Sequence, residues 1–316
     1  MGANTRGISG TEHMRIVGAR MENMAHLPAL NLELTSKCQV KCVWCLMQTF
    51  DKIRKEHMEF AQFRRFVAIN ADYLRRCGTR ITPFSRGEPL LYPRFWECCA
   101  ILRKEGLAIG SMATNLSVRI RVRDFLENPI DYIVVNLGGT TKEVHESVML
   151  HSRFELVVEN LRKLWAAGVP VHVKINPARP NIPQLAELPQ FVEYLGGKPE
   201  YAQEYTTMLP HPDDASPEEI RYFMTHVYDP EHPELFRFAV RDGALVVADR
   251  GCPAGLMVDT IFADGGLSVC CHDHHQQSVV GNAFDVPLEE LRSSPRYRGT
   301  YLKGLRRRLR NCRFCA

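Results

Sequence analysis

The chain has 316 residues, and its 40 Lys and Arg side chains outnumber its 36 Asp and Glu side chains so little that the formal net charge is +4. This excess is too small to indicate a nucleic-acid-binding protein. No stretch reaches the roughly 18 consecutive apolar residues that a membrane span requires. Residues 1–26 lack the apolar core of a secretory signal, so we expect a cytoplasmic protein.

Short apolar runs alternate with amphipathic stretches from residue 29 to about residue 208. This alternation predicts an α/β fold with a parallel sheet. Six strand–helix units are fewer than the eight of a closed barrel, so we expect a partial (β/α)6 TIM-like barrel. The predicted strands are 29–34, 80–84, 107–114, 131–137, 169–176 and 200–208, and the predicted helices are 60–76, 94–105, 122–127, 154–167 and 183–194.

The alternation weakens after residue 210. A helix is predicted to start at Ser216-Pro217, because Pro is favoured in the first helical turn. Beyond residue 251, a hairpin-like segment over 258–269 and a helix near 288–301 predict a compact unit. We therefore divide the chain into an N-terminal extension (1–28), an α/β domain (29–210), a linker (211–250) and a C-terminal unit (251–316).

Three of the eleven cysteines directly follow the first predicted strand. Cys38, Cys42 and Cys45 have x3 and x2 spacing, and loops at the carboxyl ends of such strands carry chemistry. An odd number of clustered cysteines indicates metal ligation better than a disulfide framework. Three thiolates on a 4Fe–4S cluster leave one iron open, as a reactive site requires. A zinc knuckle without its fourth ligand is the alternative.

This Cys-x3-Cys-x2-Cys pattern, with Trp44 directly before the third cysteine, resembles the signature of the radical S-adenosylmethionine (radical SAM) superfamily. The resemblance implies that SAM chelates the open iron. It also implies that an electron from the cluster cleaves SAM into methionine and a 5′-deoxyadenosyl radical. By the same resemblance Trp44 would lie near the adenine, and ordinary packing is the alternative role for this side chain.

Other residues resemble the SAM-binding motifs of the superfamily. Ser85-Arg86-Gly87-Glu88-Pro89 follows the second strand and is similar to the GGEP motif, with Arg86 in place of the first Gly. The resemblance implies that Gly87 and Glu88 bind the SAM amino group. It further implies that three asparagines in or after predicted strands contact the ribose and carboxylate of SAM, although Asn at a strand end is also a common turn former. These are Asn115, Asn136 and Asn176.

A second group of cysteines lies in the C-terminal unit. Cys252-x12-Gly-x4-Cys270, followed by Cys312-x2-Cys315, supplies four thiolates, which is enough to saturate a metal site. The spacing permits a four-cysteine zinc site. It also resembles the twitch domain, a shortened SPASM extension in which a β-hairpin and a helix surround one auxiliary cluster. We therefore expect two 4Fe–4S clusters, together with SAM as co-substrate.

Cys271 is an additional thiol beside Cys270. If both lie on an extended strand, their side chains point to opposite faces, so that only one of them serves the cluster. The two assignments can be exchanged, because Gly266 stands four residues before Cys271. The other thiol either packs or donates a hydrogen atom to a substrate radical. Cys77, Cys98 and Cys99 lie in helical stretches and are predicted to pack.

The resemblance implies hydrogen abstraction from an unactivated carbon, with electrons from an external flavodoxin- or ferredoxin-like reductase. Within the superfamily the chain resembles neomycin epimerase and 2-deoxy-scyllo-inosamine dehydrogenase, and one auxiliary cluster favours a small sugar or aminocyclitol. We expect an epimerase that inverts a sugar carbon of an aminoglycoside-like metabolite, with Cys271 as hydrogen donor. Oxidation of a secondary alcohol is the alternative, and a non-catalytic zinc-binding module is the second alternative.

Overall fold

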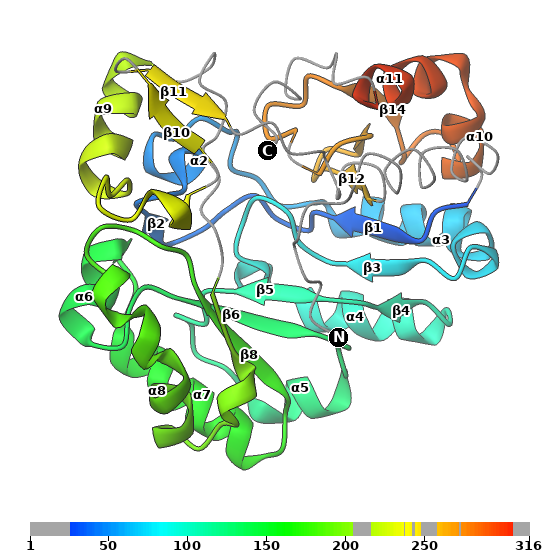
Figure 1. The fold of residues 1–316 in the computed structure, drawn as a ribbon. Coiled ribbons are helices and arrows are strands. Elements are labelled where there is room, and N and C mark those ends of the chain that lie inside the picture. The colour runs from blue at the N-terminus through cyan, green and yellow to red at the C-terminus, as the bar shows by residue number, and fades with distance from the viewer. Residues whose placement is uncertain are drawn as a thin grey trace.

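The computed structural model describes residues 26–204, 216–236, 238–241, 244–247, 258–271 and 273–305. Strands and helices alternate along the first of these ranges (Figure 1). The strands there are β1 (Ala29–Leu32), β2 (Lys41–Cys42), β3 (Arg80–Thr82), β4 (Ala108–Ile109), β5 (Met112–Thr114), β6 (Ile133–Leu137), β7 (Met149–Leu150), β8 (Val171–Ile175) and β9 (Ala202–Glu204). The helices are α2 (Leu46–Thr49), α3 (Phe60–Arg76), α4 (Phe95–Lys104), α5 (Val122–Glu127), α6 (Lys142–Val148), α7 (Phe154–Ala166) and α8 (Leu188–Tyr194).

The predicted α/β fold with a parallel sheet is confirmed. β1, β3 and β4 pair in parallel in one sheet, and β5, β6, β8 and β9 pair in parallel in another. The single strand predicted over 107–114 is divided into β4 and β5 at Gly110-Ser111. A Cβ at Gly110 would lie 2.9 Å from Cβ of Arg80, so only glycine permits the two segments to approach this closely. Among the described strands the two sheets do not close into a barrel.

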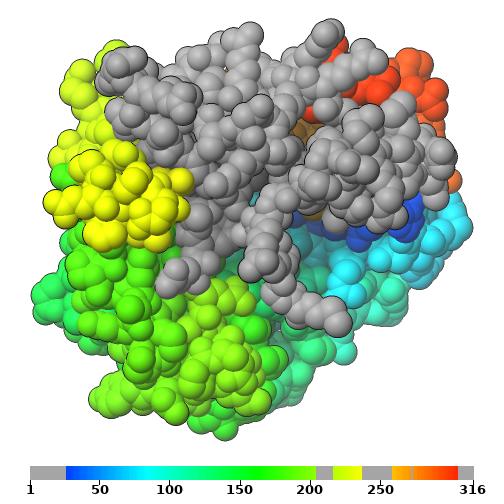
Figure 2. Space-filling model, viewed as in Figure 1, coloured from blue at the N-terminus to red at the C-terminus, as the bar shows by residue number. Residues whose placement is uncertain are grey.

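Amphipathic patterns position these elements. In β8, Val171, Val173 and Ile175 are fully buried, whereas His172 and Lys174 between them face the other side of the sheet. In α7, Val157, Leu161 and Leu164 are fully buried at helical spacing. The helices α6, α7 and α8 lie beside the sheet of β5, β6, β8 and β9 and belong to the green lower part of the molecule in Figure 1 and Figure 2.

The C-terminal segment joins the sheet of the α/β domain. β12 (Val258–Ile261) pairs in parallel with β1, from Ala29 opposite Val258 to Leu32 opposite Ile261. β13 (Gly266–Ser268) and β14 (Val279–Asn282) extend the sheet in antiparallel fashion, which gives the order β14-β13-β12-β1-β3-β4. The helices α10 (Leu288–Ser293) and α11 (Pro295–Leu305) follow. The predicted hairpin is therefore present, and the single helix predicted near 288–301 is divided into α10 and α11 at Ser294, which has extended backbone angles.

A buried ionic network anchors α10 and α11 to the sheet. Arg292 of α10 forms an ion pair with Asp259 of β12, and both side chains are almost fully buried. The hydroxyl of Tyr297 in α11 donates to Asp259 Oδ1 at 2.9 Å. The network fixes the two helices against β12, and its hydrogen bonds offset part of the desolvation cost of the buried ion pair.

Part of the predicted linker has regular structure. α9 (Pro217–His226) begins with a capping box formed by Ser216 and Glu219, so the predicted helix start is confirmed. An antiparallel hairpin of β10 (Phe238–Arg241) and β11 (Ala244–Val247) follows. α9 contacts the α2 region, where Lys52 pairs with Glu219 at 2.6 Å. No helix in the described part of the chain is long and apolar enough to cross a bilayer.

Candidate active site

The cysteine loop lies between the end of β1 and α2. Cys42 belongs to β2, which pairs with β7, and Cys45 caps the N-terminus of α2. The backbone amide of Cys45 donates to the carbonyl of Cys42 at 2.8 Å, which closes a tight turn between these two ligand candidates. Neither β2 nor β7 was predicted from the sequence, since two-residue strands leave no periodic pattern.

The three thiols share a desolvated environment. Burial raises the pKa of Cys38 to about 12, and the pKa values of Cys42 and Cys45 are also raised, mainly by burial. The neighbouring thiols and the carboxyl group of Glu88 raise the pKa of Cys42 further. Thiolates in such a place need a bound cation for charge compensation, as a soft-metal or iron–sulfur site provides. Within the described ranges, no three His, Cys, Asp or Glu side chains surround a position for a single metal ion.

The Ser85–Pro89 loop lies directly against the cysteine loop. The amide of Glu88 donates to the carbonyl of Lys37 at 2.8 Å. A Cβ at Gly87 would lie 2.4 Å from the carbonyl oxygen of Thr35 and 2.7 Å from that of Lys37, both of them backbone atoms. The glycine predicted from the motif is therefore required by the close approach of two backbone segments, one of which leads to Cys38.

The carboxylate of Glu88 connects this loop to the end of β5. Its Oε1 accepts from the hydroxyl of Thr114 at 2.7 Å, and its Oε2 accepts from the amide of Asn115 at 2.7 Å. The amide of Leu90 donates to Oε1 at 3.1 Å. Burial raises the pKa of Glu88 to about 7, while these hydrogen bonds lower it. Glu88 thus fixes the geometry of the loop through protein contacts, a role that the motif did not predict.

Asn115 lies next to the first cysteine. Its Nδ2 is 3.6 Å from Sγ of Cys38, and its Oδ1 accepts from the side-chain amide of Gln39 at 3.0 Å. The sequence predicted Asn115 as a contact of SAM, and the structure places it beside the proposed cluster ligand. Gln39, between two of the cysteines, was not predicted to take part in the site.

Two other predicted asparagines carry buried amide oxygens that need a hydrogen-bond donor. Oδ1 of Asn136 on β6 and Oδ1 of Asn176 after β8 are buried and have no hydrogen-bond partner among the described residues. Buried polar atoms are normally paired, so an incoming group with hydroxyl or ammonium donors would satisfy both oxygens. The ribose and the amino group of SAM have donors of this kind, and the residues present therefore fit the nucleoside.

Lys174 is a site candidate that the sequence analysis missed. It stands in register with Asn136 on β6 and Gln203 on β9, so the three side chains share one face of the parallel sheet. Burial lowers the pKa of Lys174 to about 8. The alternation of His172 and Lys174 with valines was the available signal, because it places two polar side chains opposite the packed face.

The C-terminal thiols differ from expectation in their local structure. β13 ends at Ser268, so Cys270 and Cys271 lie in the turn that follows, and the extended-strand geometry assumed for them is wrong. Cys270 is 7% exposed and its amide donates to Oγ of Ser268 at 3.3 Å, whereas Cys271 is partly exposed. Cys252, Cys312 and Cys315 lie outside the described residues.

The remaining predictions concern packing. Cys98 and Cys99 of α4 are fully buried in the hydrophobic core, which confirms their interpretation as packing residues, and Cys77 at the end of α3 is half-buried against that core. Trp44 is partly buried and also packs against the core. This contact agrees with the packing alternative and leaves its predicted place near an adenine as a prediction.

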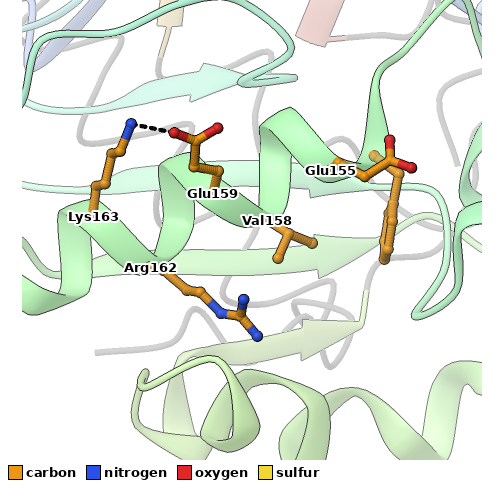
Figure 3. Close-up of a pocket in the computed structure, with 6 residues that line it drawn as sticks. Glu155, Val158, Glu159, Arg162 and Lys163 are labelled. Atoms are coloured by element: carbon orange, nitrogen blue, oxygen red, sulfur yellow. Dashed lines mark hydrogen bonds and ion pairs between the residues drawn. The ribbon is translucent and has the colours of Figure 1, made fainter.

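A surface pocket of about 350 Å³ lies on the outward face of α7 (Figure 3). The lining side chains alternate with the buried ones of this helix, and an ion pair joins Lys163 to Glu159 across it. None of the predicted site residues lines this pocket, which is formed by Phe154, Glu155, Val158, Glu159, Arg162 and Lys163.

Comparison with known families agrees with both cysteine groups. Residues 32–178 match the radical SAM superfamily, and residues 252–316 match the SPASM family, described as an iron–sulfur cluster-binding domain. A radical SAM domain implies a 4Fe–4S cluster and SAM, and a SPASM domain implies additional iron–sulfur clusters. These matches support iron–sulfur clusters over the zinc alternatives for both groups.

Curated relatives match about half of the chain. Mycofactocin maturase MftC of Mycobacterium tuberculosis is 27% identical over 161 residues, which cover 50% of this chain and 40% of the relative. GTP 3′,8-cyclase of Vibrio vulnificus is 22% identical over 175 residues, which cover 54% of this chain and 51% of the relative. The matched region thus spans only about half the length of these relatives.

Solved structures share the fold over nearly the whole chain. The structure of BtrN in complex with AdoMet and 2-DOIA has a TM-score of 0.53 at 14% identity, and the match covers 92% of this chain and 92% of BtrN. SuiB of Streptococcus suis bound to the precursor peptide SuiA has a TM-score of 0.60 at 13% identity, with 91% of this chain and 70% of SuiB covered. At these identities the likeness shows the fold.

Proposed function

Since the chain carries a radical SAM domain and a C-terminal iron–sulfur cluster-binding domain, we propose that it is a cytoplasmic radical SAM epimerase of aminoglycoside-like sugars. We favour an epimerase because two adjacent thiols differ in exposure: Cys270 is buried and Cys271 is partly exposed. The buried thiol suits a ligand of the auxiliary cluster, and the accessible thiol suits a group that meets substrate.

The proposed cluster ligands follow the two cysteine groups. Cys38, Cys42 and Cys45 would hold the first 4Fe–4S cluster, and their desolvated thiols favour a bound cationic centre. When bound, that cluster supplies the electron that cleaves SAM. The proposed ligands of the auxiliary cluster are Cys252, Cys270, Cys312 and Cys315.

We assign the SAM contacts to the residues that surround the cysteine loop. Gly87 and Glu88 would bind the amino group of SAM. Gly87 lets this loop pack against the backbone of Thr35 and Lys37, and the hydrogen bonds of Glu88 hold the loop and Asn115 in place. The unpaired amide oxygens of Asn136 and Asn176 would accept hydrogen bonds from the nucleoside. Trp44 would pack near the adenine.

The chemical step would begin when the 5′-deoxyadenosyl radical removes a hydrogen atom from a substrate carbon and becomes 5′-deoxyadenosine. Cys271 would then donate a hydrogen atom from its S–H group to the opposite face of that carbon. The resulting thiyl radical needs one electron and one proton to return to the thiol. An external flavodoxin- or ferredoxin-like reductase is the proposed source of the electrons.

Oxidation of a secondary alcohol is the second candidate function. The likeness to BtrN supports it, because that fold covers 92% of both chains and binds 2-DOIA in its complex. In this reaction the substrate radical would lose a proton, pass one electron to the auxiliary cluster and become a ketone, and Cys271 would have no chemical role. Peptide substrates are a further class to test, since SuiB was solved with its precursor peptide.

Incubation of the anaerobically reconstituted, reduced enzyme in D2O with SAM and a panel of aminoglycosides, aminocyclitols and peptides tests the proposal. An epimerase gives a product of inverted configuration that carries one deuterium at the new C–H bond. A product two mass units lighter than its substrate identifies the dehydrogenase. Cys271→Ser should abolish epimerisation and leave 5′-deoxyadenosine formation intact, while Cys77→Ser serves as the control with an unrelated half-buried thiol. An inverted product without deuterium would overturn Cys271 as donor.

A further inference from the structure

Arg86 occupies the position where the GGEP-like motif would have its first glycine, and its side chain is buried. The guanidinium binds the carboxylate of Glu33 with two hydrogen bonds, Nε to Oε2 at 2.8 Å and Nη2 to Oε1 at 2.7 Å. The exposed fractions of the two side chains are 3% and 0%. A bidentate pair in such surroundings has a strongly preferred geometry.

The same guanidinium reaches into the C-terminal segment. Nη1 of Arg86 donates to the carbonyl of His274 at 2.8 Å, and the guanidinium carbon lies 4.4 Å from the ring centre of Phe262. Glu33 makes a parallel contact, since its Oε1 accepts from the amide of Ala263 at 3.3 Å. The ion pair therefore contacts both ends of the segment 262–274, which contains Cys270 and Cys271.

The backbone of Arg86 is held from the opposite direction by the cysteine loop. Nε2 of Gln48, in the helix that follows Cys45, donates to the carbonyl of Arg86 at 2.9 Å and to that of Ser36 at 3.0 Å. The amide of Arg86 donates to Oε2 of Glu33 at 3.1 Å. One residue thus contacts the first cysteine loop, the end of β1 and the C-terminal segment.

We propose that Arg86 and Glu33 are positioning residues that couple the SAM-binding loop to the turn bearing Cys270 and Cys271. The inference rests on the proposed function, in which Gly87 and Glu88 belong to the SAM site and Cys270 holds the auxiliary cluster. Because Arg86 precedes Gly87 directly, a change in the loop on SAM binding is transmitted through the guanidinium to His274 and Phe262. The turn is thereby set in place when SAM is bound.

The test measures amide hydrogen exchange of residues 262–278 in the reconstituted holoprotein, with and without SAM, alongside SAM binding by equilibrium dialysis. The variant R86M/E33L replaces both charges by apolar groups, a change that is often neutral for the stability of buried ion pairs. R86K keeps the charge but loses the bidentate geometry. R296M is the matched control, since Arg296 also donates to a carbonyl of the C-terminal segment, Val279 at 3.1 Å, but comes from α11.

We expect SAM to slow exchange in this segment of the wild type about tenfold, and R86M/E33L to lose this response while still binding SAM. R86K should retain part of the response, and R296M should retain all of it. A SAM-binding wild type without any change in exchange would overturn the coupling alone. A full response in R86M/E33L would also overturn it. A wild type that does not bind SAM would overturn the proposed function, and the inference with it.

Discussion

Replacing Gly87 with alanine tests how tightly the SAM loop is packed on the cysteine loop. The new Cβ would lie 2.4 Å from the carbonyl oxygen of Thr35, whereas real Cβ atoms essentially never come within 3.0 Å of another atom. The loop that contains Gly87 must therefore move by at least about 0.6 Å, because the atom it meets belongs to the backbone and not to a flexible side chain. The displacement weakens the hydrogen bond from the amide of Glu88 to the carbonyl of Lys37, now 2.8 Å long.

The loss in free energy of unfolding has two contributions, the overpacking and the weakened hydrogen bond. Overpacking costs about 1–3 kcal/mol, and a weakened buried hydrogen bond adds about 1 kcal/mol, so we expect the free energy of unfolding to fall by about 2–4 kcal/mol. The shift also moves the contacts of Glu88 with the end of β5, and a misplaced site of this kind loses about tenfold or more in rate. Urea unfolding and the rate of 5′-deoxyadenosine formation under reducing conditions measure the two effects.

Gly299→Ala is the matched control, because nothing lies within 4 Å of a Cβ at Gly299 in α11. Alanine in a helix interior stabilises by roughly 0.5–1 kcal/mol relative to glycine, so this variant should be at least as stable as the wild type. Wild-type stability together with wild-type SAM cleavage in the Gly87→Ala variant would refute the close packing of the two loops.

Three further predictions concern single side chains. Cys42→Ala should abolish the visible absorbance of the first cluster and all 5′-deoxyadenosine formation, while Cys98→Ala in the core should lose only about 1–2 kcal/mol of stability; an active Cys42→Ala enzyme would exclude this ligand. Asn136→Leu should weaken SAM binding about 5- to 30-fold in equilibrium dialysis with little change in unfolding, because its buried Oδ1 has no partner in the described protein; unchanged affinity would remove Asn136 from the SAM site. Burial lowers the pKa of His145 to about 4 from an ordinary 6.5, so the unfolded chain binds the proton more tightly and stability falls as the pH drops from about 6.5 towards 4, by at most about 3 kcal/mol. His145→Asn keeps an acceptor for the amide of Gly138 and should flatten this part of the pH profile of urea unfolding, and an unchanged slope would show that another group is responsible.

Local sequence patterns predicted much of the fold. The helix predicted over 60–76 is α3 with the same bounds, because its buried residues recur at helical spacing along its whole length. The helix predicted over 122–127 is α5, also with the same bounds. The division of the strand over 107–114 was not predictable, since the close approach of Gly110 to Arg80 at the break involves a residue that is distant in the sequence. Two-residue strands such as β2 and β7 likewise depend on a partner that is distant in the sequence.

The features of the candidate site likewise fall into those that local sequence predicts and those that depend on residues distant in the chain. Cysteine spacing and the Gly87-Glu88 pair are local, so they could be read from the sequence. The partner of Arg86 could not be, because Glu33 lies 53 residues away in the sequence and the pair forms only in the folded chain. Lys174 was missed because a lysine in a strand is normally exposed, and only the register with Asn136 and Gln203 reveals its shared face.

The parallel pairing of β12 with β1 has a consequence for dissecting the molecule. A fragment that stops before Gly251 would expose the backbone amides and carbonyls of Ala29–Leu32 along an open margin of apolar sheet, just upstream of the cysteine loop. Such a fragment is a template for intermolecular strand pairing, so we expect it to precipitate. The cysteine loop is therefore best studied in the intact polypeptide.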